Sequence, residues 1–140
     1  MARIFWDTNL FIYLFEQNPK WLPLVVRHRE RMLARGDVLL TSWLTVGEIL
    51  TKPKETRNAI LERAYRNFFE SDAVKVVPFE AHAAERFAEV RSRYTVRPAD
   101  AIQLACAASE GIDLFVTNDS RLANIVIDGI TFLTGLENVP

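Results

Sequence analysis

The sequence has very few of the residues on which several common kinds of site depend. It contains one cysteine, Cys106, which excludes an internal disulfide and a CxxC metal site. Cys106 lies in the apolar run 101–108 and is interpreted as a small core residue. The two histidines, His28 and His82, lie among charged or alanine neighbours away from the expected strand ends, so neither is expected to be functional. Neither GxxxxGK[ST] nor GxGxxG occurs, which excludes a phosphate-cradling glycine loop.

Long apolar runs and an excess of positive charge are also missing. No apolar run approaches the roughly 20 residues of a membrane span, and Asp7 interrupts the layout of a signal peptide. We therefore expect no membrane association and a cytoplasmic location. The net charge of −1 excludes only nucleic-acid binding that is driven mainly by overall charge. With 140 residues, 49% hydrophobic and 25% charged, the sequence predicts a single domain over residues 1–140.

Two kinds of apolar pattern alternate along the chain. Short apolar runs predict buried strands at 4–6, 37–41, 73–77 and 113–117, with an edge strand at 130–133. Apolar residues at helical spacing predict helices at 8–17, 21–35, 43–50, 55–71, 80–93 and 98–110. The segment Lys52-Pro53-Lys54 is expected to separate the third helix from the fourth. The alternation predicts an α/β fold with a mainly parallel sheet of four to five strands and helices on both faces.

Acidic residues stand where such a fold gathers functional groups. Asp7-Thr8-Asn9 follows the first predicted strand, and Thr117-Asn118-Asp119 follows a late one. Asp100 lies in the first turn of a helix, and Glu48 lies inside an apolar helix, where a carboxylate needs a partner. In open α/β sheets, ligands bind outside the carboxyl ends of the strands. These four acids are therefore candidate site residues.

Convergence of the four acids would require a counter-charge. Each pair of like charges about 4 Å apart costs roughly 1–4 kcal/mol, depending on the local dielectric. Either some carboxylates take up protons or a divalent cation lies among them, and oxygen ligands favour Mg²⁺ or Mn²⁺. A cation with open water positions polarises a phosphodiester and activates a water, which is the chemistry of a metal-dependent nuclease. Polar neighbours would then orient ligands or waters, namely Thr8, Asn9, Thr117 and Asn118.

Simpler interpretations exist for several of these residues. Asp7 and Asp100 fit helix capping or contact with the positive end of a helix dipole, and Asp119 also resembles an ordinary cap. Three arginines that precede Asp100 are tentative ligands for substrate phosphates: Arg91, Arg93 and Arg97.

Taken together, these motifs resemble the PIN-domain ribonucleases, and among them the toxins of VapC type. The resemblance covers nearly the whole chain and rests on the order of the motifs around Asp7, Glu48, Asp100 and Asp119. It implies a three-layer α/β/α domain, a Mg²⁺- or Mn²⁺-dependent endoribonuclease acting on RNA, a homodimer, and an antitoxin that occludes the site. The four acids would form the catalytic set, in which Asp7, Asp100 and Asp119 bind the metal. Leu122 replaces an aromatic residue found in many relatives, which we interpret as a packing substitution.

Other functions fit the sequence less well. A phosphate-accepting receiver domain uses adjacent acids and a late strand-end lysine, but no lysine follows Lys75. A phosphatase with an Asp-x-Asp start would have its second acid at position 9, where the chain has Asn9. A non-catalytic PIN-like binding module typically lacks some of the acids, whereas all four are present. The alternatives to a nuclease are therefore such a module or a Mg²⁺-dependent phosphoryl-handling domain.

Overall fold

The sheet forms the central layer, and its five strands run parallel in the order β3-β2-β1-β4-β5. The computed structural model describes all residues from 1 to 140. The strands are β1 (Arg3–Trp6), β2 (Val38–Ser42), β3 (Lys75–Val77), β4 (Ile112–Val116) and β5 (Ile130–Thr134). This architecture confirms the α/β fold class predicted from the alternation of strands and helices, with β5 on the edge as expected.

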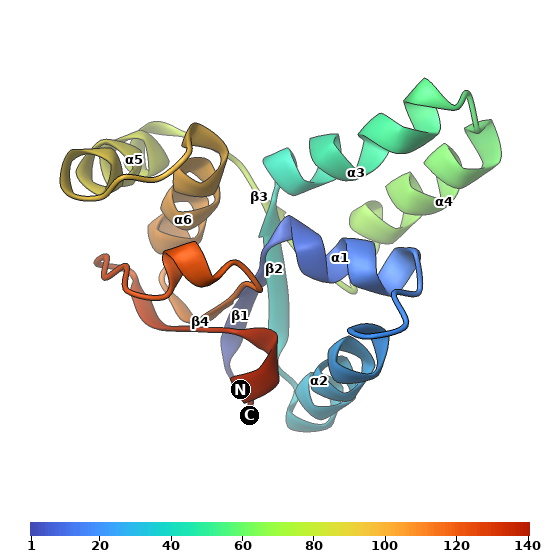
Figure 1. Ribbon diagram of the computed structural model, residues 1–140, viewed down its shortest axis with the longest axis horizontal. Helices are drawn as coiled ribbons and strands as arrows, with labels where there is room; N and C mark the ends of the chain where they lie inside the picture. The colour runs from blue at the N-terminus through green and yellow to red at the C-terminus, as the bar shows by residue number, and fades with distance from the viewer.

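Helices cover both faces of the sheet. The α-helices are α1 (Thr8–Phe15), α2 (Leu22–Arg35), α3 (Trp43–Glu55), α4 (Ala59–Glu70), α5 (Ala81–Arg93) and α6 (Pro98–Glu110). Two short 3₁₀ helices follow, η1 (Ser120–Leu122) and η2 (Leu136–Asn138). Helices α5 and α6 lie on one side of the sheet, and α1 to α4 lie on the other (Figure 1). None of these helices combines the length and the apolar character that a membrane span requires.

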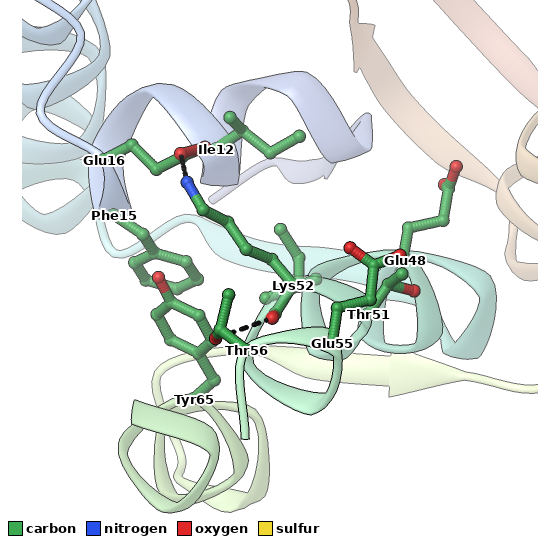
Figure 2. Close-up of a pocket in the computed structure, with 10 residues that line it drawn as sticks. Ile12, Phe15, Glu16, Glu48, Thr51, Lys52, Glu55, Thr56 and Tyr65 are labelled. Atoms are coloured by element: carbon green, nitrogen blue, oxygen red, sulfur yellow. Dashed lines mark hydrogen bonds and ion pairs between the residues drawn. The ribbon is translucent and has the colours of Figure 1, made fainter. Parts of the chain in front are cut away.

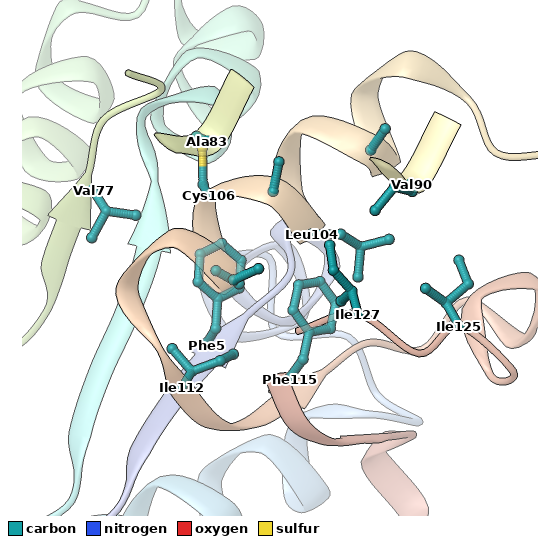
Figure 3. Packing of buried hydrophobic residues seen from close by; sticks show 14 of the residues in the cluster. Phe5, Val77, Ala83, Val90, Leu104, Cys106, Ile112, Phe115, Ile125 and Ile127 are labelled. Atoms are coloured by element: carbon teal, nitrogen blue, oxygen red, sulfur yellow. The ribbon is translucent and has the colours of Figure 1, made fainter. Parts of the chain in front are cut away.

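Each face of the sheet buries its own apolar core. Against α5 and α6, Phe5 and Phe115 stack with ring centroids 5.1 Å apart, and Leu104 packs beside them (Figure 3). Against α1 to α4, the core contains Trp6 of β1 and Phe11 of α1, whose ring centroids are 5.2 Å apart. The strands are therefore apolar on both sides, as expected for a parallel sheet that is covered on both faces. Cys106 is buried, as predicted, and burial raises the pKa of its thiol to about 11.

The connections that follow the neighbouring strands β1 and β4 leave toward opposite faces of the sheet. After β1 the chain enters α1 on one face, whereas after the neighbouring β4 it enters η1, whose Leu122 packs into the core of the other face. Between two adjacent strands whose connections diverge in this way, a crevice opens at their carboxyl ends. Asp7 follows β1 directly, and Asp119 lies just beyond β4.

The sequence-based boundary between α3 and α4 is wrong. Helix α3 continues through Pro53 to Glu55, and α4 begins only at Ala59. Pro53 lies in the last turn of α3, so its missing N–H removes a single hydrogen bond close to the helix end. The turn between the helices instead depends on Arg57, which has φ 52°, and on Asn58, whose Oδ1 accepts a hydrogen bond of 3.0 Å from the N–H of Leu61.

His28 is a core residue of α2. It is 1% exposed, and its ring centroid lies 5.7 Å from that of Trp6. Burial and the positive charge of Arg35 lower the pKa of His28 from 6.5 to about 4, although Asp37 acts in the opposite direction. The ring is therefore neutral at pH 7. His82 is exposed on α5, and neither histidine lines the cavity that contains the acids.

We expect His28 to make the protein sensitive to mild acid. Between pH 6.5 and about 4 the unfolded chain binds a proton at His28 that the folded chain does not. The stability from the neutral ring is thus complete above pH 6.5 and is lost as the pH falls toward 4. The free energy of unfolding of the wild type, relative to His28→Phe, should fall by up to about 3 kcal/mol between pH 7 and pH 4. Urea unfolding at both pH values measures this difference, with His82→Phe as the exposed control; an unchanged difference would refute the assignment.

Candidate active site

One cavity at the carboxyl ends of the strands contains all four predicted acids. Its volume is about 350 Å³, and Asp7, Glu48, Asp100 and Asp119 line it. Asp7 follows β1, Glu48 lies in the second turn of α3, Asp100 lies in the first turn of α6, and Asp119 follows β4. Four separate segments of the chain thus contribute one carboxylate each. Their joint position agrees with the expected convergence, while their catalytic roles stay a prediction.

Asp7 is the only buried residue of the four, with 7% of its surface exposed. Its Oδ1 accepts a hydrogen bond of 2.8 Å from the N–H of Thr8 and so caps α1, and its Oδ2 accepts one of 2.7 Å from the hydroxyl of Thr117. Burial raises the pKa of Asp7; these two hydrogen bonds oppose the shift, and the charges of Asp100 and Glu48 add to it. Asp7 therefore serves as a helix cap and also presents an unfavourably buried charge to the cavity.

Two arginines balance the carboxylates of Asp100 and Asp119. Arg97 places its Nε 3.0 Å from Asp100 Oδ2 and its Nη2 3.7 Å from Asp119 Oδ2. Arg121 binds Asp119 with two nitrogens, Nε at 2.9 Å from Oδ1 and Nη2 at 2.6 Å from Oδ2. The Arg121 guanidinium holds the pKa of Asp119 below its usual range. Both arginine side chains are 63% exposed, so water screens these ion pairs and they can exchange readily.

Glu48 lies at the open side of the cavity. The apolar pattern of α3 suggested an enclosed carboxylate, but the residue is exposed. The predicted need for a partner is met by Thr8, whose hydroxyl donates a hydrogen bond of 2.7 Å to Glu48 Oε1. Thr8 therefore connects Glu48 to the amino end of α1, next to Asp7.

A layer of buried polar side chains lies beneath the acids, and of its members only Thr8 was predicted as a site residue. This polar layer consists of Thr8, Thr41, Ser42, Thr45 and Gln103, all of which are buried and joined by hydrogen bonds. The available signals were the density of hydroxyl residues between 41 and 45 and a lone glutamine in the apolar run of α6. Arg121 was also missed, although its spacing from Asp119 within one short turn indicates a possible ion pair.

The other predicted helpers have different surroundings. Thr117 contacts Asp7, as described, and Asn9 is exposed and lines the cavity. Asn118 instead donates a weak hydrogen bond of 3.4 Å to the hydroxyl of Tyr13 and lines a neighbouring pocket that it shares with Asp119. Asn118 thus neither lines the acid cavity nor forms a hydrogen bond to any of the four acids.

The three candidate substrate arginines are not equivalent. Arg97 lines the cavity, whereas Arg91 and Arg93 do not. Arg91 donates a hydrogen bond of 3.1 Å to the carbonyl of Val96 and so supports the loop that carries Arg97. Only Arg97 is therefore positioned to contact a group bound among the acids.

The chemistry of the cavity fits a hard divalent cation. The acidic groups that face it are all carboxylates, and Mg²⁺ and Mn²⁺ prefer such oxygen ligands. As the side chains stand, no three acidic, histidine or cysteine residues lie close enough to share an ion. The arginine pairs explain this spacing, because Asp100 and Asp119 turn toward Arg97 and Arg121.

A second pocket adjoins the cavity and shares Ile12 and Glu48 with it. Its volume is about 450 Å³, and it lies between α1, α3 and α4 (Figure 2). Lys52 extends across it to Glu16, with Nζ 2.5 Å from Oε1. Glu16 is therefore paired in this pocket and does not line the acid cavity.

Several solved structures align with this chain over most of its length. A chain of VapBC2 from Rickettsia felis, solved with a promoter DNA fragment, is 16% identical, with a TM-score of 0.75 and coverage of 95% of this chain and 98% of that one. DNA-bound VapBC from Salmonella typhimurium is 21% identical, with a TM-score of 0.67 and coverage of 97% and 99%. VapC20 from Mycobacterium tuberculosis, a sarcin-ricin loop cleaving toxin, is 22% identical, with a TM-score of 0.65 and coverage of 88% and 96%. These likenesses establish a shared fold.

Comparison with known sequences identifies the family of the chain. No curated protein sequence matches the chain. The profile of the PIN domain matches residues 4–127, a range that begins within β1, extends past β4 and includes all four acids. The fold and this match lead to the same conclusion: the chain belongs to the PIN domain family.

Proposed function

We propose that this protein is a Mg²⁺- or Mn²⁺-dependent endoribonuclease that hydrolyses RNA phosphodiester bonds. The observation that carries the proposal is the presence of Asp7, Glu48, Asp100 and Asp119 in one cavity. No nucleophilic cysteine or histidine lies there, so acid-supported hydrolysis is the chemistry that the residues favour. The VapC20 structure, whose fold is similar, is that of an RNA-cleaving toxin, which supports RNA as the substrate.

In this proposal Asp7, Asp100 and Asp119 hold the metal. A divalent ion bound there supplies Lewis-acid activation of the phosphodiester and of a water. Glu48, whose Oε1 is fixed by the Thr8 hydroxyl, accepts a proton from the attacking water at the open side of the cavity. Thr117 keeps the Asp7 carboxylate oriented through its hydrogen bond of 2.7 Å. Asn9 is a further polar contact for substrate or water at the cavity wall.

Arg97 is proposed as the main phosphate contact. Its guanidinium already bridges Asp100 and Asp119, and it can turn to a phosphate when those acids bind a cation. Arg97→Ala should raise the KM for RNA roughly tenfold, the loss expected for one charged hydrogen bond, and reduce the slope of log affinity against log salt by about one. Steady-state cleavage and RNA binding at several salt concentrations measure both effects. Arg93→Ala is the control, because Arg93 is exposed and lies outside the cavity; equal effects of the two changes would contradict the proposal.

We further propose that the protein is the cytoplasmic toxin of a toxin–antitoxin pair and forms a homodimer. The VapBC complexes with the same fold support an antitoxin partner. The pocket beside the cavity combines the apolar Phe15 and Ile49 with the carboxylates of Glu48 and Glu55. Such a surface favours a peptide with apolar and basic side chains over an RNA phosphate backbone. The exposed Trp43, with 55% of its surface accessible, suits a protein interface.

Mapping of RNA ends tests the enzymatic proposal. The purified full chain is incubated with total RNA and Mg²⁺ or Mn²⁺, and new ends are located by sequencing, with the Asp7→Asn/Asp100→Asn double variant treated in parallel. We expect discrete ends that recur with the wild type and are absent from the double variant. Identical ends in both samples would contradict the proposal and indicate a contaminating nuclease. RNA binding without new ends would instead favour a non-catalytic binding module.

A further inference from the structure

The polar layer beneath the acids is centred on Gln103. Its side chain emerges from α6 and is 2% exposed, so it has no access to bulk water. The Nε2 group lies 2.9 Å from Thr8 Oγ1 and 2.7 Å from Thr45 Oγ1, while Ser42 Oγ donates to Oε1. One amide thus joins α1, the end of β2 and the start of α3 to α6.

Counting protons gives these hydrogen bonds a direction. A threonine hydroxyl has one proton to donate, and a carbonyl or carboxylate oxygen can only accept. Thr8 Oγ1 lies 2.7 Å from Glu48 Oε1, so its proton goes to Glu48 and its lone pairs accept from Gln103. Thr41 Oγ1 lies 2.9 Å from the carbonyl oxygen of Trp6 and 2.8 Å from Thr45 Oγ1, and it can donate to either. The hydroxyls of Thr8 and Thr45 each accept one hydrogen bond from Gln103 Nε2, so both amide protons are used.

We propose that Gln103 is a positioning residue that commits the Thr8 hydroxyl to Glu48. This inference rests on the proposed nuclease function, because it assigns Glu48 a role that requires a fixed carboxylate. The amide supplies two donors and one acceptor in the arrangement that the three hydroxyl residues demand. Any side chain that accepts at the Nε2 position would attract the Thr8 proton and release Glu48.

Two substitutions at position 103 distinguish a role in directing the Thr8 hydroxyl from a role in filling space. Gln103→Glu keeps the shape but, in its ionised form, replaces both donors with acceptors, so Thr8 turns its proton from Glu48 to the new carboxylate. Gln103→Met keeps the approximate volume without any donor or acceptor, so nothing at position 103 competes for the Thr8 proton, but the amide no longer directs the hydroxyl to Glu48. If Gln103 only filled space, activity would follow stability across both variants. If it directs Thr8, Gln103→Glu should lose more activity than Gln103→Met at equal folded fraction.

We expect Gln103→Glu to lower kcat roughly 10- to 100-fold, with the KM for RNA changed less than about threefold, as is typical for a group that orients a site residue. Gln103→Met should lower kcat by a smaller factor than Gln103→Glu, because Thr8 loses the amide that directs it but meets no competing acceptor. The Thr8→Val variant has no hydroxyl to redirect. Adding Gln103→Glu to it should therefore lower kcat less than about twofold relative to Thr8→Val alone. Gln17→Glu is the matched control, since Gln17 is the other glutamine of the chain and is exposed. If Gln103→Glu lowered kcat in the Thr8→Val background as much as it does in the wild type, the proposal would be overturned.

An NMR measurement tests the amide orientation without any cleavage assay. In the folded protein the side-chain NH₂ pair of Gln103 should exchange slowly with solvent and show cross-peaks to the methyl groups of Thr8 and Thr45. The pair is assigned by its disappearance in Gln103→Glu. Cross-peaks to Ser42 in their place would mean the reverse amide orientation and would refute the inference. If the NMR result holds but the wild type cleaves no RNA, the proposed function fails while the hydrogen-bond assignment stands.

Discussion

Replacing Asp7 or Asp100 with asparagine is expected to abolish RNA cleavage while leaving the protein folded. Each change removes a negative charge from the cavity, and we expect kcat to fall by at least about 10³-fold because the metal and the developing charge both depend on it. In Asp7→Asn the new side-chain amide can still accept from the N–H of Thr8 through its oxygen, so the cap of α1 persists. Cleavage of a defined RNA under single-turnover conditions measures the loss.

The same variants are expected to lose activity without losing thermal stability. Burial raises the pKa of Asp7, which shows that the charged form is unfavourable in the metal-free fold. Without metal, Asp7→Asn should therefore leave the melting temperature unchanged or raise it. Asp100→Asn loses only its contact with the 63%-exposed Arg97, a pair worth at most about 1 kcal/mol. Asp72→Asn, an exposed acid outside the cavity, is the control for both measurements. Unaltered cleavage by the Asp7→Asn/Asp100→Asn double variant would eliminate the assigned site.

Removing divalent cations is expected to stop cleavage completely, and adding Mg²⁺ or Mn²⁺ is expected to restore it. The reason is electrostatic: four carboxylates face one cavity, and Arg97 and Arg121 offset only part of their charge. An ion that binds the folded chain and not the unfolded one also stabilises it by mass action. Saturating Mn²⁺ should accordingly raise the melting temperature of the wild type.

Two comparisons distinguish a bound ion from a general salt effect. The increase in melting temperature should disappear in the Asp7→Asn/Asp100→Asn variant and persist in Asp72→Asn. Ca²⁺ and raised NaCl serve as controls for charge screening without the geometry that Mg²⁺ prefers. Cleavage that continues in excess EDTA would refute the metal-dependent mechanism, and a Mn²⁺ effect of equal size in the double variant would place the ion elsewhere.

The order of elements and the identity of the acids could be predicted because both are recorded locally in the chain. The apolar run before Asp7 indicates a doubly buried strand, and the position of an acid at its end needs no distant information. Gly36, with φ 72°, ends α2 where its position after the last helical turn predicts. The predicted helix boundary at Pro53 was wrong because a proline removes one backbone hydrogen bond wherever it stands. Its presence does not show whether it lies in the middle of a helix or in the last turn, where the loss is tolerated.

The partners of those acids could not be predicted, since they are set by packing between distant segments. Gln103 and Thr8 are 95 positions apart, and their hydrogen bond exists because side chains from α6 and α1 come together at the carboxyl end of β2. Gly129 illustrates the same limit, because a Cβ there would lie 2.2 Å from the carbonyl oxygen of Ala108, a contact that no local pattern records.

Short-range patterns thus specified which segments become strands or helices and which acids stand at their ends, because side-chain periodicity and capping act over a few residues. Three-dimensional packing specified that the four carboxylates share one cavity, that Arg97 and Arg121 balance two of them, and that Gln103 lies beneath. Charge balance and hydrogen-bond direction depend on distances across the sheet, and those distances exist only when both faces are packed.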